Sequence, residues 1–349
     1  MYKDTEHDPK VSVIVPIKQE QQYIEECLKR LLKQTYPKSK TEILVVDGMS
    51  EDQTRQIVNR ELDKANRGWP GMVRLLDNPK GQRASAMNIG IEQAKYDVII
   101  RVDARTIIAD DYIEKCVKTL IETGAENVGG VQKPTTIEGP NMLTQEAIGI
   151  ALSNPFGIGN AQFRIGTKSG FADTVYLGCF RKEVFDKVGL FDEEASVMTE
   201  DSDINYRIKK AGGRVYLDKD IVAYYSPRDS IRELWKLYFR YGGARAGFFL
   251  KHKNLSSWRQ FVPPCFLLFL LVFPFLGFIH SHFIYLWAFA ILTYVIVDFV
   301  VCCYLSLKEK RPALLAKLLF VFPTLHFAWA SGFWRRLLQR PRPGKYWGY

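Results

Sequence analysis

The sequence lacks the glycine-rich loops by which many nucleotide-binding proteins hold phosphate groups. Neither GxGxxG nor GxxxxGK[ST] occurs among its 349 residues, which argues against dinucleotide binding and against P-loop chemistry. The first apolar, strand-like run is followed instead by PIKQE, residues 16–20. A nucleotide diphosphate, if one is bound, must therefore be held in another way.

Two further absences concern metal sites and compartment. The six cysteines include no CxxC pair, so neither a zinc site nor a disulfide framework is predicted. The opening residues, MYKDTEHDPK, lack the apolar stretch of a signal peptide. We therefore expect the region before the first long apolar run to stay in the cytoplasm.

Positive charge is abundant but unevenly distributed. The formal net charge is +10, yet residues 228–349 hold 17 Lys and Arg against 4 Asp and Glu, so the rest of the chain is slightly acidic. The basic residues stand beside long apolar runs, where they are better explained as topology and lipid-headgroup signals than as a nucleic-acid surface. Membrane lipid is the expected partner, and nucleic acid is not.

Three apolar segments follow in this basic third. Residues 261–278 and 283–307 are long enough, at ~1.5 Å per residue, to cross a hydrocarbon layer of ~30 Å. The turn between them has no Lys or Arg, whereas basic residues flank both runs, so the positive-inside rule predicts a hairpin with cytoplasmic ends. Crossing by the third segment, about 314–334, would place the basic C-terminus outside. We expect it to be re-entrant or interfacial, with three full spans as the alternative.

Strand and helix patterns alternate through the first hundred residues. Apolar, β-branched runs at 11–15, 42–46, 73–76 and 97–102 predict strands, and amphipathic or capped segments predict helices between them. This alternation predicts an α/β fold with a parallel sheet covered on both faces. Ligands bind such sheets beyond the carboxyl ends of the strands. The polar or punctuating residues at these strand ends are Pro16, Asp47, Asn78 and Asp103.

The pattern then becomes irregular from Val128 to Pro227, where we expect loops that contact substrate. Short helices are predicted near 182–188 and 201–211. Three regions result: a cytoplasmic domain over 1–227, an interfacial helical linker over 228–260, and a membrane region over 261–349.

Two acidic features could carry chemistry. Asp103 ends the strand DVIIRV, where a carboxylate can hold a divalent cation that bridges a diphosphate or can cap the helix that begins near Asp110. The segment TEDSD begins at Thr199 and opens a helix. Capping explains one or two of its acids but not all three, so at least one is a candidate general base.

These elements, in this order, resemble the family 2 glycosyltransferases, which have a GT-A fold, Rossmann-like and built to bind nucleotide sugars. The matching segments are VSVIVPIKQE, VVDGMSED, NPKGQRASAMNIGIEQA, RVDAR and TED, over about residues 10–227. Within the family, the chain is similar to membrane-anchored enzymes of exopolysaccharide assembly, such as the succinoglycan glucosyltransferases. The resemblance implies a nucleotide-diphosphate sugar as donor and a glycan or lipid-linked oligosaccharide as acceptor.

The resemblance also implies roles for single residues. Asp47 would hydrogen-bond the nucleotide base, with Pro16 and Glu20 on the same wall. Arg83 and Asn88 would line the sugar-donor side, Arg83 near the diphosphate.

At the part of the site where the sugar is transferred, Asp103 would hold Mg²⁺ or Mn²⁺, and Asp201 would be the catalytic base. Glu200 and Asp203 would support or cap it, and Gly178 would form part of the acceptor floor.

One position departs from the family pattern. Arg105 stands where the metal motif has its second acid, so a cation would depend on Asp103, phosphate oxygens and water. The alternative is that Arg105 itself neutralises the leaving diphosphate. We expect the metal.

The segment YFRYGGAR, with Arg240 and Arg245, loosely matches an element with which processive members hold product and diphosphate. An interfacial basic helix explains it equally well, and the two interpretations are compatible.

The function expected from the sequence is an inverting glycosyltransferase of polysaccharide biosynthesis, integral to the plasma membrane, with its catalytic domain in the cytoplasm. Two alternatives stay open: a polyprenyl-phosphate sugar transferase, and a non-catalytic nucleotide-sugar-binding subunit of a polysaccharide assembly.

Overall fold

The structure is a computed structural model that describes residues 8–136, 139–194, 198–253 and 258–339. It divides into two compact units. The N-terminal unit comprises residues up to Lys133 together with Gln162–Tyr225, and the C-terminal unit comprises Pro134–Ala161 together with the chain from Ser226. The sequence prediction placed 134–161 in the first domain. These residues instead belong to the C-terminal unit, because helix α5 (Met142–Ala151) packs on its helices.

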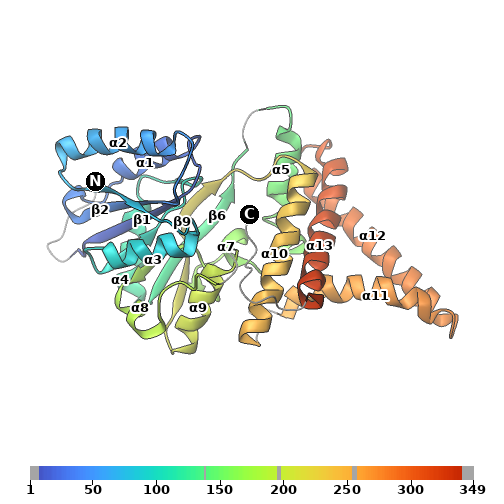
Figure 1. Ribbon diagram of the computed structural model, residues 1–349. Helices are drawn as coiled ribbons and strands as arrows, with labels where there is room; N and C mark the ends of the chain where they lie inside the picture. The colour runs from blue at the N-terminus through green and yellow to red at the C-terminus, as the bar shows by residue number, and fades with distance from the viewer. Residues whose placement is uncertain (1–7, 137–138, 195–197, 254–257, 340–349) are drawn as a thin grey trace. The chain divides into compact units, whose positions relative to one another are not determined.

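Four parallel strands form one half of the sheet in the N-terminal unit (Figure 1). They lie in the order β3-β2-β1-β4 and are paired in parallel register, as the alternation of the sequence predicted. Their bounds are β1 Val11–Ile17, β2 Thr41–Asp47, β3 Val73–Asp77 and β4 Val98–Arg101. The connecting helices are α1 Ile24–Leu32, α2 Thr54–Gly68 and α3 Arg83–Gln93. All four strands end at one edge, where the candidate site residues begin.

The other half of the sheet is antiparallel and was missed by the sequence analysis. β8 pairs with β4, and the order continues β8-β6-β9-β5, with β7 paired to β9, giving nine strands within the described residues. The bounds are β5 Ile107–Ile108, β6 Asn127–Pro134, β7 Gly170–Phe171, β8 Tyr176–Arg181 and β9 Val215–Tyr225. The expectation of an irregular region was wrong, because glycines interrupt β6 and charged residues interrupt β9, which hides the alternation.

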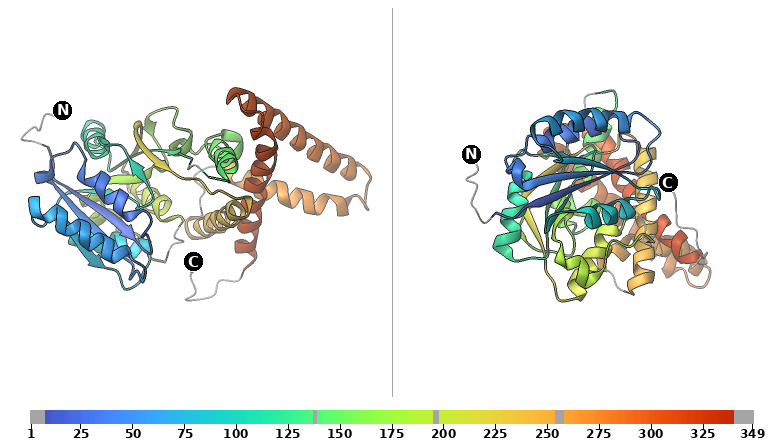
Figure 2. Two further views of the ribbon diagram at one scale, coloured as in Figure 1. Left: turned by 90° about the horizontal axis from the view of Figure 1, so that it is seen from above. Right: turned by 60° about the vertical axis from the view of Figure 1, so that its left-hand side comes forward.

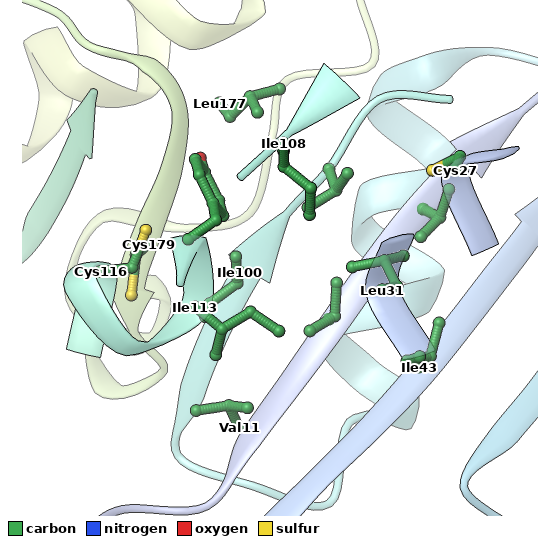
Figure 3. Packing of buried hydrophobic residues seen from close by; sticks show 14 of the residues in the cluster. Val11, Cys27, Leu31, Ile43, Ile100, Ile108, Ile113, Cys116, Leu177 and Cys179 are labelled. Atoms are coloured by element: carbon green, nitrogen blue, oxygen red, sulfur yellow. The ribbon is translucent and has the colours of Figure 1, made fainter. Parts of the chain in front are cut away.

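Helices cover both faces of this sheet. Odd-numbered positions of β1 pack with α1, α2 and α4 (Tyr112–Thr123), in the cluster that Figure 3 shows from close by. Ile14 points to the opposite face and packs with α3, α8 (Glu183–Val188) and α9 (Glu200–Lys210). Because side chains alternate along a strand, β1 is buried on both faces. The central strands are thereby fixed from both sides.

The C-terminal unit is helical. Besides α5, its helices are α6 Pro155–Ile158, α10 Ile231–His252, α11 Val262–Leu276, α12 His282–Lys308 and α13 Leu314–Leu338. The short elements η1 Lys38–Lys40, α7 Gln162–Ile165 and η2 Trp258–Phe261 complete the fold of the two units. Helices α10 and α13 run side by side (Figures 1 and 2). Their backbones touch at two glycines: a Cβ on Gly242 would lie 2.0 Å from the carbonyl oxygen of Trp329, and one on Gly332 would lie 1.8 Å from that of Phe239.

Three helical segments of this unit are long and apolar enough to cross a membrane: Trp258–Leu276, His282–Lys308 and Leu314–Leu338. They differ in how much protein covers them. In their most apolar stretches, only 6% and 11% of the residues of the first two are buried, against 44% of those of the third. The first two form a hairpin, α11 and α12, that contacts α13 and extends away from it (Figure 2). Most of the apolar surface of these two helices is therefore not covered by other described residues of the protein.

The sheet leaves no space for a side chain at Gly130 in β6. A Cβ there would lie 1.8 Å from the carbonyl oxygen of Ile221 in β9, whereas one on Gly170 in β7 would meet no atom within 4 Å. We expect Gly130→Ala to reduce the free energy of unfolding by ~3 kcal/mol or more, because the strand backbones must separate. Gly170→Ala is the matched control and should melt within about 2 °C of the unchanged chain. Equal melting temperatures for both variants would contradict this packing.

Candidate functional site

The loop after β2 is organised around Asp47. Its carboxylate is completely buried and accepts hydrogen bonds from the backbone N–H of Ser50 at 3.1 Å and from the Ser50 hydroxyl at 2.5 Å. The Arg55 guanidinium lies 2.8 Å from Asp47 and 2.8 Å from Asp77, so it joins the ends of β2 and β3. Pro16 is beside Val46 in the same sheet. The Asp47 carboxylate therefore holds the strand-end loops in place.

Glu20 and Arg105 lie together beside this loop. The Arg105 Nε–H donates to both carboxylate oxygens of Glu20, at 2.8 and 3.0 Å, and its guanidinium carbon lies 5.2 Å from the ring centre of Tyr23. The Glu20 N–H donates to the hydroxyl of Thr54 at 2.8 Å. Burial raises the pKa of Glu20, although Arg105 opposes this effect. Arg105, which stands where the motif has its second acid, is thus paired with the carboxylate of Glu20.

The centre of the site is Arg101, the last residue of β4, which the sequence analysis did not single out. Its side chain is only 2% exposed. The guanidinium donates from Nε to Oδ1 of Asp103 at 2.8 Å, from Nη2 to Oδ2 of Asp103 at 3.1 Å, and from Nη1 to Oδ1 of Asp201 at 2.5 Å. Nη2 also lies 3.6 Å from Oε1 of Glu200.

The sequence did carry a signal for Arg101. A guanidinium inside an apolar strand must be paired with a carboxylate, and Asp103 lies two residues later, where side chains of an extended segment share a face. The alternative role for Asp103 as a helix cap does not hold, because the next long helix, α4, begins only at Tyr112. Asp103 is bound to Arg101 instead.

The acidic segment TED begins helix α9. Thr199 is the N-cap residue but makes no capping hydrogen bond with its side chain. Glu200 is buried, and its Oε1 accepts from Arg83 Nη1 at 3.1 Å. Three carboxylates, those of Asp103, Glu200 and Asp201, therefore face two guanidiniums in one cluster.

The carboxylates of this cluster differ in their protonation equilibria. Burial raises the pKa of Asp201 to about 7, Arg101 opposes this, and the neighbouring carboxylates of Glu200 and Asp103 reinforce it. The side chain of Asp201 remains 31% exposed, so water reaches it and offsets part of the effect of burial. For Asp103, burial works in the same direction, but Arg101 and Arg83 outweigh it, and the pKa is lowered. Asp201 can therefore exchange a proton near neutral pH while Asp103 stays ionised.

Asp203 and Asn88 make contacts that hold the fold together. Asp203 accepts from Arg207 Nε at 2.8 Å, and Arg207 also donates to backbone carbonyls of the segment that precedes α9. The amide of Asn88 exchanges two hydrogen bonds of 2.9 Å with the backbone of Phe191 and donates to Glu193 at 3.1 Å. Asn88 of α3 and Arg207, the partner of Asp203 on α9, thus attach two helices to the loop before α9.

Gly178 lies in β8 with a φ of +106°, and a Cβ there would lie 2.6 Å from the ring of Phe180. Its backbone conformation therefore requires glycine. Arg240 and Arg245 belong to α10 of the C-terminal unit, where Arg240 is exposed and Arg245 stacks over Phe248 at 5.2 Å.

A divalent cation fits this site only together with a diphosphate. The described residues include no group of three or more His, Cys, Asp or Glu that could hold a metal. Asp103 is 23% exposed, and each of its oxygens accepts one hydrogen bond from Arg101, so lone pairs remain. Mg²⁺ and Mn²⁺ are commonly held by one or two carboxylates, phosphate oxygens and water. Asp103 can supply the protein's share of such a site.

Comparisons with known proteins agree with the fold and the motifs. Residues 12–189 match the family Glycosyl transferase family 2. The succinoglycan biosynthesis protein ExoA of Rhizobium meliloti (strain 1021) is 31% identical over 333 residues, which cover 93% of this chain and 94% of the relative. A dolichyl N-acetyl-alpha-D-glucosaminyl phosphate 3-beta-D-2,3-diacetamido-2,3-dideoxy-beta-D-glucuronosyltransferase of Methanococcus voltae is 26% identical, covering 67% of this chain and 72% of the relative.

A solved structure shares the fold. The mannosyltransferase PcManGT of Pyrobaculum calidifontis superposes with a TM-score of 0.58 at 20% identity, covering 95% of this chain and 88% of that one. The GT-A fold expected from the sequence is thereby confirmed, and so is the resemblance on which that expectation depended. With its strand-end site residues and a relative that matches almost from end to end, the chain belongs to glycosyl transferase family 2 and is a glycosyltransferase.

Proposed function

We propose that this glycosyltransferase moves a sugar from a nucleotide-diphosphate sugar to a lipid-linked glycan, with inversion at the anomeric carbon. The observation that carries the mechanism is the placement of Asp201. Its partly exposed carboxylate has a raised pKa and shares the guanidinium of Arg101 with the strand-end residue Asp103. Asp201, the proposed proton acceptor, therefore lies next to Asp103, the residue that we propose for the diphosphate side of the site.

In the proposed reaction, Asp201 accepts the proton of the acceptor hydroxyl as its oxygen attacks the anomeric carbon. The bond between that carbon and the diphosphate oxygen breaks in the same displacement, and the electron pair leaves with the diphosphate. An α-linked donor gives a β-linked product. Asp103 would hold a divalent cation, which would supply positive charge to the leaving diphosphate.

The relatives support the choice of substrates. PcManGT was solved in complex with GDP-Man and Mn²⁺. The Methanococcus relative is named for a dolichyl-linked sugar phosphate acceptor, and the Rhizobium relative for succinoglycan biosynthesis. We infer a sugar donor of the same chemical class for this chain and a growing glycan on a lipid carrier as the acceptor.

We also propose that α11 and α12 enter the plasma membrane as a hairpin, with the catalytic domain in the cytoplasm. Their apolar side chains are exposed along their length, which is costly in water. Helix α13 differs, because it packs along α10, and α10 carries the exposed charges of Arg232, Lys236 and Arg240. A helix with such a neighbour fits the membrane interface better than the hydrocarbon layer.

Replacement of the base gives the first test. Asp201→Asn should reduce transfer to below ~1% of the wild-type rate, because general base catalysis contributes 10²–10⁴-fold, and should leave binding of the nucleotide sugar nearly unchanged. Asp173→Asn is the control, since Asp173 is likewise a carboxylate paired with a cation, here Lys209 of α9. Transfer is followed with labelled nucleotide sugars and lipid-linked acceptors. Turnover of Asp201→Asn near the wild-type rate would show that another group is the base.

The pH dependence of transfer gives a second test. Asp201 must be ionised to accept a proton, and its pKa is raised to about 7. We expect kcat/KM to fall about tenfold per pH unit below that pKa and to level off above it. Binding of the nucleoside diphosphate, measured at the same pH values, separates this effect from loss of substrate binding. A rate that stays constant from about pH 5 to 8 would be inconsistent with a carboxylate of raised pKa as the base.

Topology gives a third test. A reporter enzyme that is active only outside the cytoplasm should be inactive when fused to the C-terminus, because the hairpin returns the chain to the cytoplasm and α13 does not cross. The same reporter inserted between Gly277 and Ser281, in the turn of the hairpin, should be active. An active C-terminal fusion would mean three full spans.

A further inference from the structure

The guanidinium of Arg101 holds two reactive carboxylates that come from distant parts of the sequence. Asp103 lies in the loop after β4, and Asp201 lies in the first turn of α9. Both oxygens of Asp103 and one oxygen of Asp201 accept from three different nitrogens of the same guanidinium. Because a guanidinium is planar and rigid, it fixes the separation and relative orientation of the two carboxylates.

Arg101 is itself fixed by the sheet. It pairs in register with Ile14 of β1, and the residue before it, Ile100, pairs with Cys179 of β8. Its strand therefore has a hydrogen-bonded neighbour on both sides, and its side chain is buried. A surface arginine could change rotamer as substrates enter, but this one belongs to a strand whose residues are all buried.

The contacts also distinguish the two oxygens of Asp201. Oδ1 accepts from Arg101, whereas Oδ2 has no hydrogen-bond partner among the residues that the structure describes. The side chain is partly exposed, so Oδ2 is the oxygen that can accept a proton from a bound hydroxyl. One arginine thus selects which oxygen of the base faces the acceptor.

We propose that Arg101 is a positioning residue of the transfer reaction: it orients Asp201 with Oδ2 free and sets its distance from Asp103, and so from the diphosphate. This inference rests on the proposed function, because it assigns Asp201 as the base. Arg101 acts through the two carboxylates and need not touch either substrate.

The test is Arg101→Lys. Lysine keeps the positive charge that the buried carboxylates require, but an ammonium group cannot form the planar, three-nitrogen set of hydrogen bonds. We expect kcat to fall about 100-fold, because a misplacement of about 1 Å at a reacting group has this effect. The dissociation constant of GDP or UDP, whichever the wild type binds, should rise by a much smaller factor than kcat falls, because the nucleotide depends on Asp103 but not on Asp201.

Arg207→Lys is the matched control. Arg207 also pairs with a carboxylate of α9, Asp203, and also donates to several acceptors. Its replacement should lower the melting temperature but leave kcat within about threefold of wild type, because it does not contact Asp201. The inference is overturned if Arg101→Lys retains wild-type kcat. It is also overturned if both variants lose activity in proportion to their loss of stability.

A second measurement covers the case in which Arg101→Lys fails to fold. A crystal structure of the wild-type chain with the nucleoside diphosphate and Mn²⁺ should show Arg101 bound to both Asp103 and Asp201. An Arg101 side chain turned away from Asp201 would overturn the inference. If the proposed function is wrong, the wild-type chain itself transfers no sugar. The crystal structure then still tests the position of Arg101 independently.

Discussion

The site depends on one buried charge, the guanidinium of Arg101. A cation inside a sheet is tolerated only when carboxylates surround it, so the position of Arg101 dictates where Asp103, Glu200 and Asp201 must lie. The strand supplies the fixed point, and α9 and the loop after β4 are held against it. The ion pairs thus link the parallel half of the sheet to the helix that carries the proposed base.

The two halves of the sheet have different tasks in this arrangement. The parallel half brings the strand-end loops of β1, β2 and β3 together through Asp47, Arg55 and the contacts of Ser50. The antiparallel half begins at β8, directly beside β4. β4 is therefore the strand at which the parallel half meets the half that leads into α9. This explains why its last residue, Arg101, and Asp103 in the loop that follows carry so many contacts.

The sequence was sufficient for the parallel half of the fold, since its strands are short, apolar and β-branched and its helices have clear apolar faces. It was insufficient for β6 and β9, where glycines and charges interrupt the alternation. Among site residues, strand-end positions such as Asp103 follow from the fold class. The contacts of Asn88 do not, because they depend on a loop at Phe191 that is distant in sequence. The pair of Asp203 with Arg207 has the i,i+4 spacing of one helix. Arg101 was overlooked because the motif drew attention to the acids beside it.

The assignment of residues 134–161 to the C-terminal unit has a consequence for synthesis on the ribosome. Helix α5 emerges long before α13, the helix against which it packs. At 5–20 residues per second, roughly 10–30 s separate the two. Throughout that interval, the apolar side of α5, with Ala147, Ile148 and Ala151, must remain uncovered or be shielded by a chaperone or the membrane surface. The order of the chain therefore makes the nascent protein dependent on its surroundings until α13 has been made.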